Sequence, residues 1–171
     1  YSDIFTCPTI LEQENKINSL KEENTVDNLL ELKNKYSKIL NKTINLPSDL
    51  QYSSPKNILL TGATGFLGVH ILDTFLKNES GNIYAIIRKE PGLSPKDKLL
   101  TKLHYYFGNK YDNQINNRIF VIEGDTTLPA FGLNQEDLFK LANSIDTIVN
   151  AAAKVSHYGA YTDFYNVNVK S

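Results

Sequence analysis

The chain has 171 residues, a formal net charge of −1 and a single cysteine, Cys7. This length is enough for one ordinary domain with a core of its own. The nearly neutral charge gives no electrostatic reason to expect nucleic acid as a partner. Because no apolar run approaches the ~20 residues that span a bilayer, we expect no membrane partner either. A lone cysteine excludes a disulfide framework and a cysteine metal cluster, and with no signal peptide visible we expect a cytoplasmic protein.

The first third of the chain is expected to be helical and then extended. Residues 12–42 are rich in Glu, Lys and Asn and carry a narrow apolar stripe at helical spacing, which is typical of a surface helix or a connector. Residues 43–56 hold two prolines and several serines, which favours a linker or an extended arm. The stripe consists of Val26, Leu29, Leu30, Leu32, Tyr36, Ile39 and Leu40.

From residue 56 onward, short apolar runs alternate with amphipathic stretches. We expect strands at 57–60, 82–87, 118–122 and 146–149. We expect helices at 66–77, from a Ser94 cap to about residue 107, and from an Asn134 cap over 135–141. This alternation predicts an α/β fold, a Rossmann-type doubly wound parallel sheet preceded by a helical segment. The inward residues of the first two helices should be Gly68, Leu72, Phe75 and Leu76, and Leu99, Leu100, Leu103 and Tyr106.

The motif with the most chemical information is Thr61-Gly62-Ala63-Thr64-Gly65-Phe66-Leu67-Gly68. Its G-x-x-G-x-x-G spacing stands between a predicted strand and a predicted helix. Glycines there let the backbone approach a pyrophosphate, and the helix behind them directs free N–H groups at the negative charge. The alternative is a tight strand-to-helix turn without a ligand, but the context favours a dinucleotide site.

Cations follow the second predicted strand. Arg88 and Lys89 stand about 20 residues beyond Gly68, where an acidic residue would bind the ribose 2′-OH of NAD and an arginine would accommodate a 2′-phosphate. The planar guanidinium of Arg88 suits phosphate oxygens, so we predict NADP rather than NAD. Lys98 and Lys102, on the following helix, either reach the same phosphate or belong to a solvated charged face.

Two more segments follow predicted strands. The carboxylate of Asp125 either accepts a hydrogen bond from the adenine amino group or caps the turn that follows. Small side chains at Ala151, Ala152 and Ala153 allow close approach of a cofactor, close helix packing, or both. We identify no catalytic residue, because His157 and the nearby tyrosines fit packing and no Tyr-x-x-x-Lys pair occurs. We also see no metal set.

Several of these motifs occur in a recognisable order: residues 61–68, Ile-Ile-Arg at 86–88, Gly-Asp at 124–125, Asn-Ala-Ala-Ala at 150–153 and Asn-Val at 168–169. Together they resemble an extended short-chain dehydrogenase/reductase. More narrowly, they are similar to the terminal thioester reductase domain of nonribosomal peptide synthetases, which carboxylic acid reductases share. The resemblance covers residues 57–171. Ser171 departs from it where glycine is usual, and Asn150 departs where histidine is frequent.

The N-terminal segment Asp3-Ile4-Phe5-Thr6-Cys7-Pro8-Thr9-Ile10 is similar to the start of the last helix of a peptidyl carrier domain. The resemblance therefore implies three parts: a carrier tail at 1–20, a helical linker at 21–55 and the first part of an NADP-binding reductase domain at 56–171. The serine that carries phosphopantetheine would lie upstream. Because the chain lacks methionine and stops inside an apparent element, we expect it to be a piece of a longer polypeptide.

The resemblance implies NADPH-dependent reductive release of an acyl or peptidyl thioester held by a carrier domain of the same polypeptide, through a thiohemiacetal to an aldehyde or alcohol. It places the residues from Thr61 to Leu67 at the pyrophosphate and Arg88 at the 2′-phosphate, with Lys98 as a possible second cation. It places Asp125 and Thr126 at the adenine. It places Ala151–Ala153 along the adenine-ribose side toward the nicotinamide. The catalytic Ser/Thr, Tyr and Lys would follow residue 171.

Three alternatives remain open. A nucleotide-sugar epimerase or dehydratase would normally begin near its glycine motif, and the 56 residues before it count against that interpretation. A non-redox relative would cyclise its thioester without hydride transfer. A structural docking piece would bind no nicotinamide cofactor at all.

Overall fold

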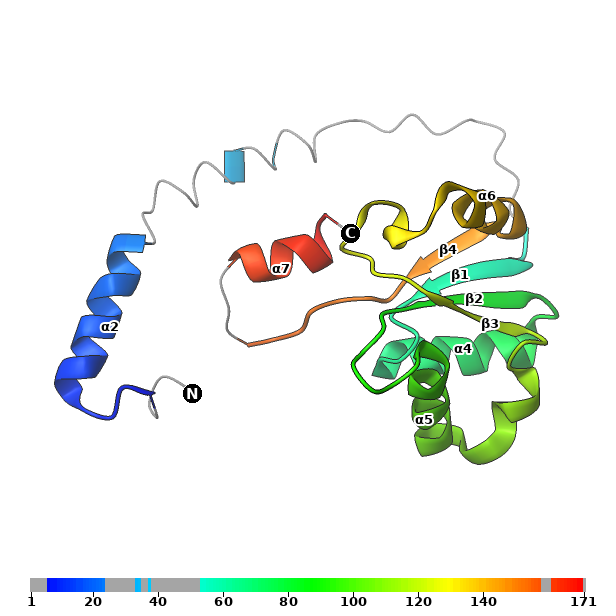
Figure 1. The fold of residues 1–171 in the computed structure, drawn as a ribbon, viewed down its shortest axis with the longest axis horizontal. Helices are drawn as coiled ribbons and strands as arrows, with labels where there is room; N and C mark the ends of the chain where they lie inside the picture. Colours follow the sequence, from blue (N-terminus) through cyan, green and yellow to red (C-terminus); the bar gives the residue numbers. More distant parts are fainter. Residues whose placement is uncertain (1–5, 24–32, 35–36, 38–52, 158–160, 171) are drawn as a thin grey trace. The chain divides into compact units, whose positions relative to one another are not determined.

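The computed structural model describes residues 6–23, 33–34, 37, 53–157 and 161–170. The chain divides into two compact units, Tyr1–Gln51 and Tyr52–Ser171. In the first unit, helix α2 spans Ile10–Glu23 (Figure 1). It begins with a reciprocal capping box: the Glu12 carboxylate accepts from the Thr9 N–H at 2.9 Å, and the Thr9 hydroxyl accepts from the Glu12 N–H at 3.3 Å. The predicted apolar stripe from Val26 to Leu40 lies outside the described residues.

The second unit is built on a four-stranded parallel sheet with the strand order β3-β2-β1-β4 (Figure 1). Its strands are β1 Asn57–Thr61, β2 Asn82–Ile87, β3 Ile119–Glu123 and β4 Thr147–Asn150. In the register, Leu60 of β1 stands opposite Ala85 of β2 on one side and Val149 of β4 on the other. The α/β expectation is therefore confirmed, and each strand begins and ends within one residue of its predicted position.

Helices cover both faces of this sheet. Helices α4, Phe66–Asn78, and α5, Pro95–Phe107, lie on one face, and α6, Gln135–Ser144, lies on the other (Figure 1). The residues Ile58, Leu59 and Leu60 are all at most 1% exposed, so β1 is buried on both faces, as its unbroken apolar run requires. The larger core cluster joins Ile58 and Leu60 to α4 and α5, and the smaller one joins Leu59 to Leu141 of α6.

Both predicted helix caps are present. The Ser94 side chain accepts from the Asp97 N–H at 3.1 Å, and the Asn134 side chain accepts from the Asp137 N–H at 2.8 Å. These bonds satisfy N–H groups that the first turn of a helix leaves without a partner. Pro95, at the first turn of α5, loses nothing by lacking an N–H.

Two of the expected inward residues of α5 are not part of the core. Leu99 and Leu103 are fully buried, but Leu100 is only half-buried and belongs to neither core cluster, and Tyr106 is 37% exposed. Its ring lies edge-on to His70 and Phe66 of α4, with centroid separations of 5.3 and 6.0 Å. The inward prediction for Tyr106 was therefore wrong, because the last turn of α5 packs across the first turn of α4 instead of against the sheet.

Short elements complete the second unit. They are the 3₁₀ segments η1, Gly108–Gln114, and η2, Pro129–Gly132, and the helix α7, Tyr161–Asn168. At the amino end of the sheet, the Asp146 carboxylate accepts hydrogen bonds from the N–H groups of Lys56 and Asn57, which fastens β1 beside β4. None of the helices in the described ranges is long and apolar enough to cross a membrane.

Candidate nucleotide-binding site

A cavity of about 1120 Å³ opens where the parallel strands end. It lies at the carboxyl ends of β1, β2 and β3 and beside the segment that follows β4. In an open α/β sheet the crevice outside the carboxyl ends of the strands, where the strand order reverses, is where ligands bind. The order β3-β2-β1-β4 places that reversal between β1 and β4. The lining residues are Gly62, Thr64, Gly65, Ile86, Ile87, Arg88, Lys98, Gly124, Asp125, Thr126, Thr127, Ala151, Ala152, Ala153, Lys154, Asn166 and Val167.

The glycine-rich loop forms one wall of this cavity, and two of its glycines are required by the backbone. Gly62 has a φ of +68°, and a Cβ there would lie 2.5 Å from the carbonyl of Ala151. A Cβ on Gly68 would lie 2.1 Å from the carbonyl oxygen of Gly62. Gly62 thus lets the loop pass against the end of β4, and Gly68 lets α4 pack directly on the loop.

Helix α4 begins at this loop without a side-chain cap. Gly65 is its N-cap residue, and no side chain accepts a hydrogen bond from the first turn. The N–H groups of a first helical turn have no partner inside the helix, and together with the helix dipole they favour an anion. This wall therefore suits a phosphate group, in contrast to the starts of α5 and α6, where side-chain caps are present.

Hydrogen bonds made by two side chains hold the end of β4 against the loop. The Thr61 hydroxyl donates to the Asn150 side-chain oxygen at 2.5 Å. The Ala152 N–H lies 3.4 Å from the Thr61 hydroxyl and 3.3 Å from that same Asn150 oxygen. Because Thr61 is only 3% exposed, it lies beneath the residues that line the cavity and is not itself part of the lining.

At the far end of the cavity, Arg88 faces Asp125. The closest distance between the guanidinium and the carboxylate is 3.9 Å, and the Arg88 side chain is 65% exposed. The other carboxylate oxygen of Asp125 accepts from the N–H and the hydroxyl of Thr127 at 2.8 and 2.7 Å. These bonds from Thr127, and to a lesser extent Arg88, hold the pKa of Asp125 below its usual value. The Asp125 carboxylate thus both shapes the turn and presents an acceptor, while Arg88 stays available to a ligand.

Lys98 of α5 approaches the same end. Its ammonium group lies 2.5 Å from a carboxylate oxygen of Glu90, and its side chain is 18% exposed. The hydrogen bond from Lys98 lowers the pKa of Glu90, so this carboxylate is ionised at neutral pH. Two of the cations that line the cavity therefore differ: Lys98 has a carboxylate at hydrogen-bond distance, and Arg88 does not.

The predicted site residues separate into two groups. Most of them line the cavity. Four do not: Thr61 and Ala63 are buried beneath the loop, and the side chains of Phe66 and Leu67 are 70% and 59% exposed outside it. Of the two cations that the sequence left open on α5, Lys98 lines the cavity and Lys102 does not.

Sequence reasoning missed part of the wall next to α7. Lys154, Asn166 and Val167 line the cavity there. The Asn168 side chain donates to the Lys154 carbonyl at 3.1 Å and accepts from its N–H at 2.8 Å, so it clamps the segment that follows the alanines. A cation directly after three alanines was the available signal for Lys154, but nothing in the local pattern marked Asn166.

The remaining sequence candidates give no further chemistry. His157 is exposed in the bend before α7, and Tyr158 lies outside the described residues. Within the ranges that the structure describes, no three His, Cys, Asp or Glu side chains are grouped so that they could hold a metal ion.

Comparison with known proteins agrees with this geometry. A family model of NAD-binding domains, described as Male sterility protein, matches residues 60–171. The terminal R domain from the myxalamid PKS-NRPS biosynthetic pathway superimposes with a TM-score of 0.60 at 28% identity, over 69% of this chain and 30% of that one. A thiolation-reductase di-domain from an archaeal non-ribosomal peptide synthetase superimposes with a TM-score of 0.56 at 42% identity, over 67% of this chain and 23% of that one.

Among curated proteins, the fusarin C synthetase of Gibberella moniliformis is 29% identical over 99% of this chain. That alignment occupies 4% of the synthetase. The chain spans 4% to 6% of the length of the curated relatives considered, which include polyketide synthases of Dictyostelium discoideum.

Proposed function

The chain belongs to the Male sterility protein family of NAD-binding domains, and from this we propose that it supplies the nucleotide-binding part of an NADPH-dependent thioester reductase. The observation that carries the proposal is the cavity at the carboxyl edge of the sheet. It combines a glycine loop and an uncapped helix start with the cations Arg88 and Lys98. We further propose the three parts predicted from the sequence: a carrier tail at 1–20, a linker at 21–55 and a reductase portion at 56–171.

The residues present fit a nicotinamide dinucleotide. Gly62 and Gly65 leave no side chain between the loop backbone and the cavity, which a pyrophosphate needs. Asp125 and Thr126, which both line the cavity, would contact the adenine. The alanines at 151–153 give a smooth wall toward the nicotinamide end. The bound cofactor would supply a hydride to the carbonyl carbon of the thioester.

The cations favour NADPH over NADH in this proposal. An acidic side chain that binds a ribose 2′-OH would repel a 2′-phosphate, whereas Arg88 attracts it. Arg88 is 65% exposed and its nearest carboxylate is 3.9 Å away, so its guanidinium can turn to a phosphate without breaking a close ion pair. Lys98 supplies a second positive charge from α5.

The substrate assignment rests on the relatives. The archaeal structure is a thiolation-reductase di-domain by its own description. The alignment with fusarin C synthetase extends over nearly the whole chain, including the N-terminal unit that holds α2. A carrier module directly before the reductase portion would deliver its phosphopantetheine thioester to the nicotinamide end of the cavity. We therefore propose an acyl or peptidyl thioester, released as an aldehyde or alcohol.

The proposal is tested with the protein at its natural length. We expect NADPH to bind at least tenfold more tightly than NADH, and Lys98→Ala to reduce that preference. Lys140→Ala is the matched control, because Lys140 also forms an ion pair with a glutamate, at 2.6 Å, but lies on α6 outside the cavity lining. With an acyl-phosphopantetheine thioester added, NADPH absorbance should fall as aldehyde accumulates.

Two outcomes would count against this function in different ways. Loss of the thioester to a cyclic product without NADPH oxidation would keep the nucleotide-binding fold but replace reduction by cyclisation. Failure to bind either dinucleotide would contradict the cofactor assignment and favour a structural docking role.

A further inference from the structure

A tight turn lies between Arg88 and Lys98, two of the cations that line the cavity. After β2, the residues Glu90-Pro91-Gly92-Leu93 form a turn in which the Leu93 N–H donates to the Glu90 carbonyl at 3.2 Å. Proline at the second position and a glycine with a φ of +75° at the third are the signature of a type II turn. Ser94 caps α5 immediately afterwards. The backbone path from Arg88 to Lys98 is therefore fixed by a turn and a helix cap.

This turn places the Glu90 carboxylate at Lys98. The distance between the two charged groups is 2.5 Å, and their side chains are 46% and 18% exposed respectively. Arg88 and Lys102 also act electrostatically on the Glu90 carboxylate, and both lower its pKa. Glu90 itself does not line the cavity, whereas Lys98 does.

The carboxylate contact of Lys98 is closer than that of Arg88. Arg88 has a carboxylate only at 3.9 Å, but Lys98 donates to one at hydrogen-bond distance. An anion that binds between Arg88 and Lys98 meets one cation that is free to move and one that is already engaged. Any phosphate contact with Lys98 must share or replace the contact with Glu90.

We propose that Glu90 is a specificity-determining residue that competes with the cofactor's 2′-phosphate for Lys98 and so limits the preference for NADPH over NADH. This inference rests on the proposed function, since it assumes that the 2′-phosphate binds at Arg88 and Lys98. Glu90 acts through Lys98 and is a positioning residue, not a catalytic one. Its removal should strengthen binding of the phosphate-bearing nucleotide and leave binding of its phosphate-free counterpart unchanged.

The test uses 2′,5′-ADP and 5′-AMP as probes, measured by titration calorimetry on the protein at its natural length. These probes differ only in the 2′-phosphate. We expect Glu90→Gln to tighten 2′,5′-ADP binding about two- to fivefold, the range for an exposed charge pair, with 5′-AMP unchanged. Glu136→Gln is the matched control, because Glu136 pairs with Lys140 at 2.6 Å outside the cavity lining.

A second variant separates competition for Lys98 from direct repulsion of the phosphate. In a Lys98→Ala background, the effect of Glu90→Gln on 2′,5′-ADP binding should disappear, because the contested cation is gone. If Glu90→Gln weakens 2′,5′-ADP binding or leaves it unchanged, or if its effect persists without Lys98, the inference is wrong. If the unaltered protein binds 2′,5′-ADP no better than 5′-AMP, the NADPH assignment itself fails, and this inference fails with it.

Discussion

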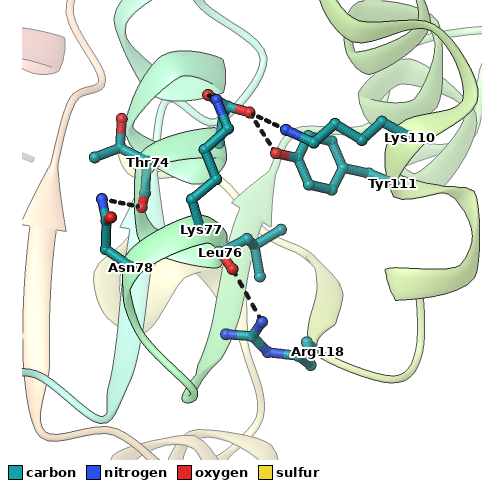
Figure 2. Close-up of polar contacts among 8 residues, drawn as sticks. Thr74, Leu76, Lys77, Asn78, Lys110, Tyr111 and Arg118 are labelled. Carbon is teal, nitrogen blue, oxygen red and sulfur yellow. Dashed lines mark hydrogen bonds and ion pairs between the residues drawn. The ribbon is translucent and has the colours of Figure 1, made fainter.

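Two regions of the second unit use the same kinds of side chain for different purposes. One is the nucleotide cavity. The other is the Asp73 cluster, formed by Asp73, Lys77, Lys110 and Tyr111 between α4 and η1. In that cluster the Asp73 carboxylate is 11% exposed and accepts from Lys77 at 2.6 Å, from Lys110 at 2.8 Å and from the Tyr111 hydroxyl. In Figure 2, dashed lines run from Lys110 and Tyr111 to this carboxylate, which carries no label. In the cavity, the carboxylate of Asp125 and the guanidinium of Arg88 are 3.9 Å apart.

The difference shows which polar groups serve the fold and which remain for a ligand. Arg118 donates to the carbonyl oxygen of Leu76 in the last turn of α4 (Figure 2). It also donates to the carbonyl oxygens of Glu79 and Gly81, which follow the helix. At the other end of the same helix, the N–H groups have no side-chain cap. One end of α4 is closed by protein groups and the other faces the cavity.

The largest effect should come from the cavity loop. Gly62→Ala places a Cβ 2.5 Å from the Ala151 backbone at a φ of +68°, and we expect it to cost about 3 kcal/mol in local stability. Gly92→Ala is the control, because its φ of +75° is equally strained but nothing lies within 4 Å. That variant should lose only about 1–2 kcal/mol. Hydrogen exchange measures each loss in the peptides that flank the substituted glycine, β1 and α4 for Gly62 and β2 and α5 for Gly92, and equal losses would refute the close approach.

The next effect should come from the Asp73 cluster. Asp73→Asn removes the charge from three hydrogen bonds at a nearly buried site, and we expect α4 to lose about 2 kcal/mol of protection against hydrogen exchange. Asp112→Asn is the matched control: Asp112 pairs with His104, and both side chains are 44% exposed, so the loss should stay below about 1 kcal/mol. Neither variant should change NADPH affinity, and a change with Asp73→Asn would mean that the two regions are coupled.

The same cluster predicts a pH dependence. Burial opposes ionisation of Asp73, but hydrogen bonds from Lys110, Lys77 and Tyr111 outweigh it and hold its pKa well below the usual value. A carboxyl group with a lowered folded-state pKa stabilises the fold fully above its unfolded pKa, about 4, and loses that contribution as the pH falls further. The difference in α4 protection between the natural protein and Asp73→Asn should therefore be constant from pH 7 to pH 5 and shrink below about pH 4. If this difference already changes near pH 6, a group other than Asp73 must cause the pH dependence.

Replacing Arg88, an exposed cation of the cavity, should affect ligand binding and not stability. We expect Arg88→Ala to weaken 2′,5′-ADP binding about tenfold and to leave 5′-AMP binding unchanged, because in the proposed complex only the 2′-phosphate would contact the guanidinium. Arg88→Lys should recover part of this loss, since it keeps the charge but not the planar fork. Lys89→Ala is the control, because the neighbouring Lys89 does not line the cavity and lies 3.7 Å from Glu123. An equal loss with Lys89→Ala would reduce Arg88 to one member of a diffuse positive patch.

The smallest effect should distinguish two helix caps. Ser94→Ala and Asn134→Ala each remove a side-chain bond to the first turn of a helix, and each should cost about 1 kcal/mol in local protection. Only Ser94 stands between the turn at Glu90 and the cation at Lys98. Ser94→Ala should therefore also change 2′,5′-ADP affinity about twofold, within the range of an exposed charge contact, whereas Asn134→Ala should not. Identical binding by both variants would show that the cap does not hold Lys98 in place.

Much of the fold could be predicted because it depends on local signals. Apolar runs mark the strands, and Ser94 and Asn134 mark the starts of two helices. The end of α6 was predicted too early, at Leu141, whereas the helix continues to Ser144. The three residues after Leu141, Ala-Asn-Ser, carry no large apolar side chain, so the periodic apolar pattern gives no signal for this last turn.

The site was predictable where it is made of backbone and of residues at strand ends. The glycine loop, Arg88 and Asp125 all follow strands directly, so the topology brings them to one edge. The partner of Lys98 was not predictable, because Glu90 reaches it through a turn of a specific geometry. The wall at Asn166 was not predictable either, since it comes from α7 and from no strand end.

The central claim is that the protein delivers a hydride from NADPH to a carrier-bound thioester. The most direct measurement incubates the protein at its natural length with acyl-phosphopantetheine thioester and NADPH deuterated at C4 of the nicotinamide, using each of the two diastereomers in turn. Mass spectrometry of the released product then locates the label. The account predicts deuterium on the former thioester carbon with one of the two diastereomers. A released product that carries no deuterium from either would contradict reductive release.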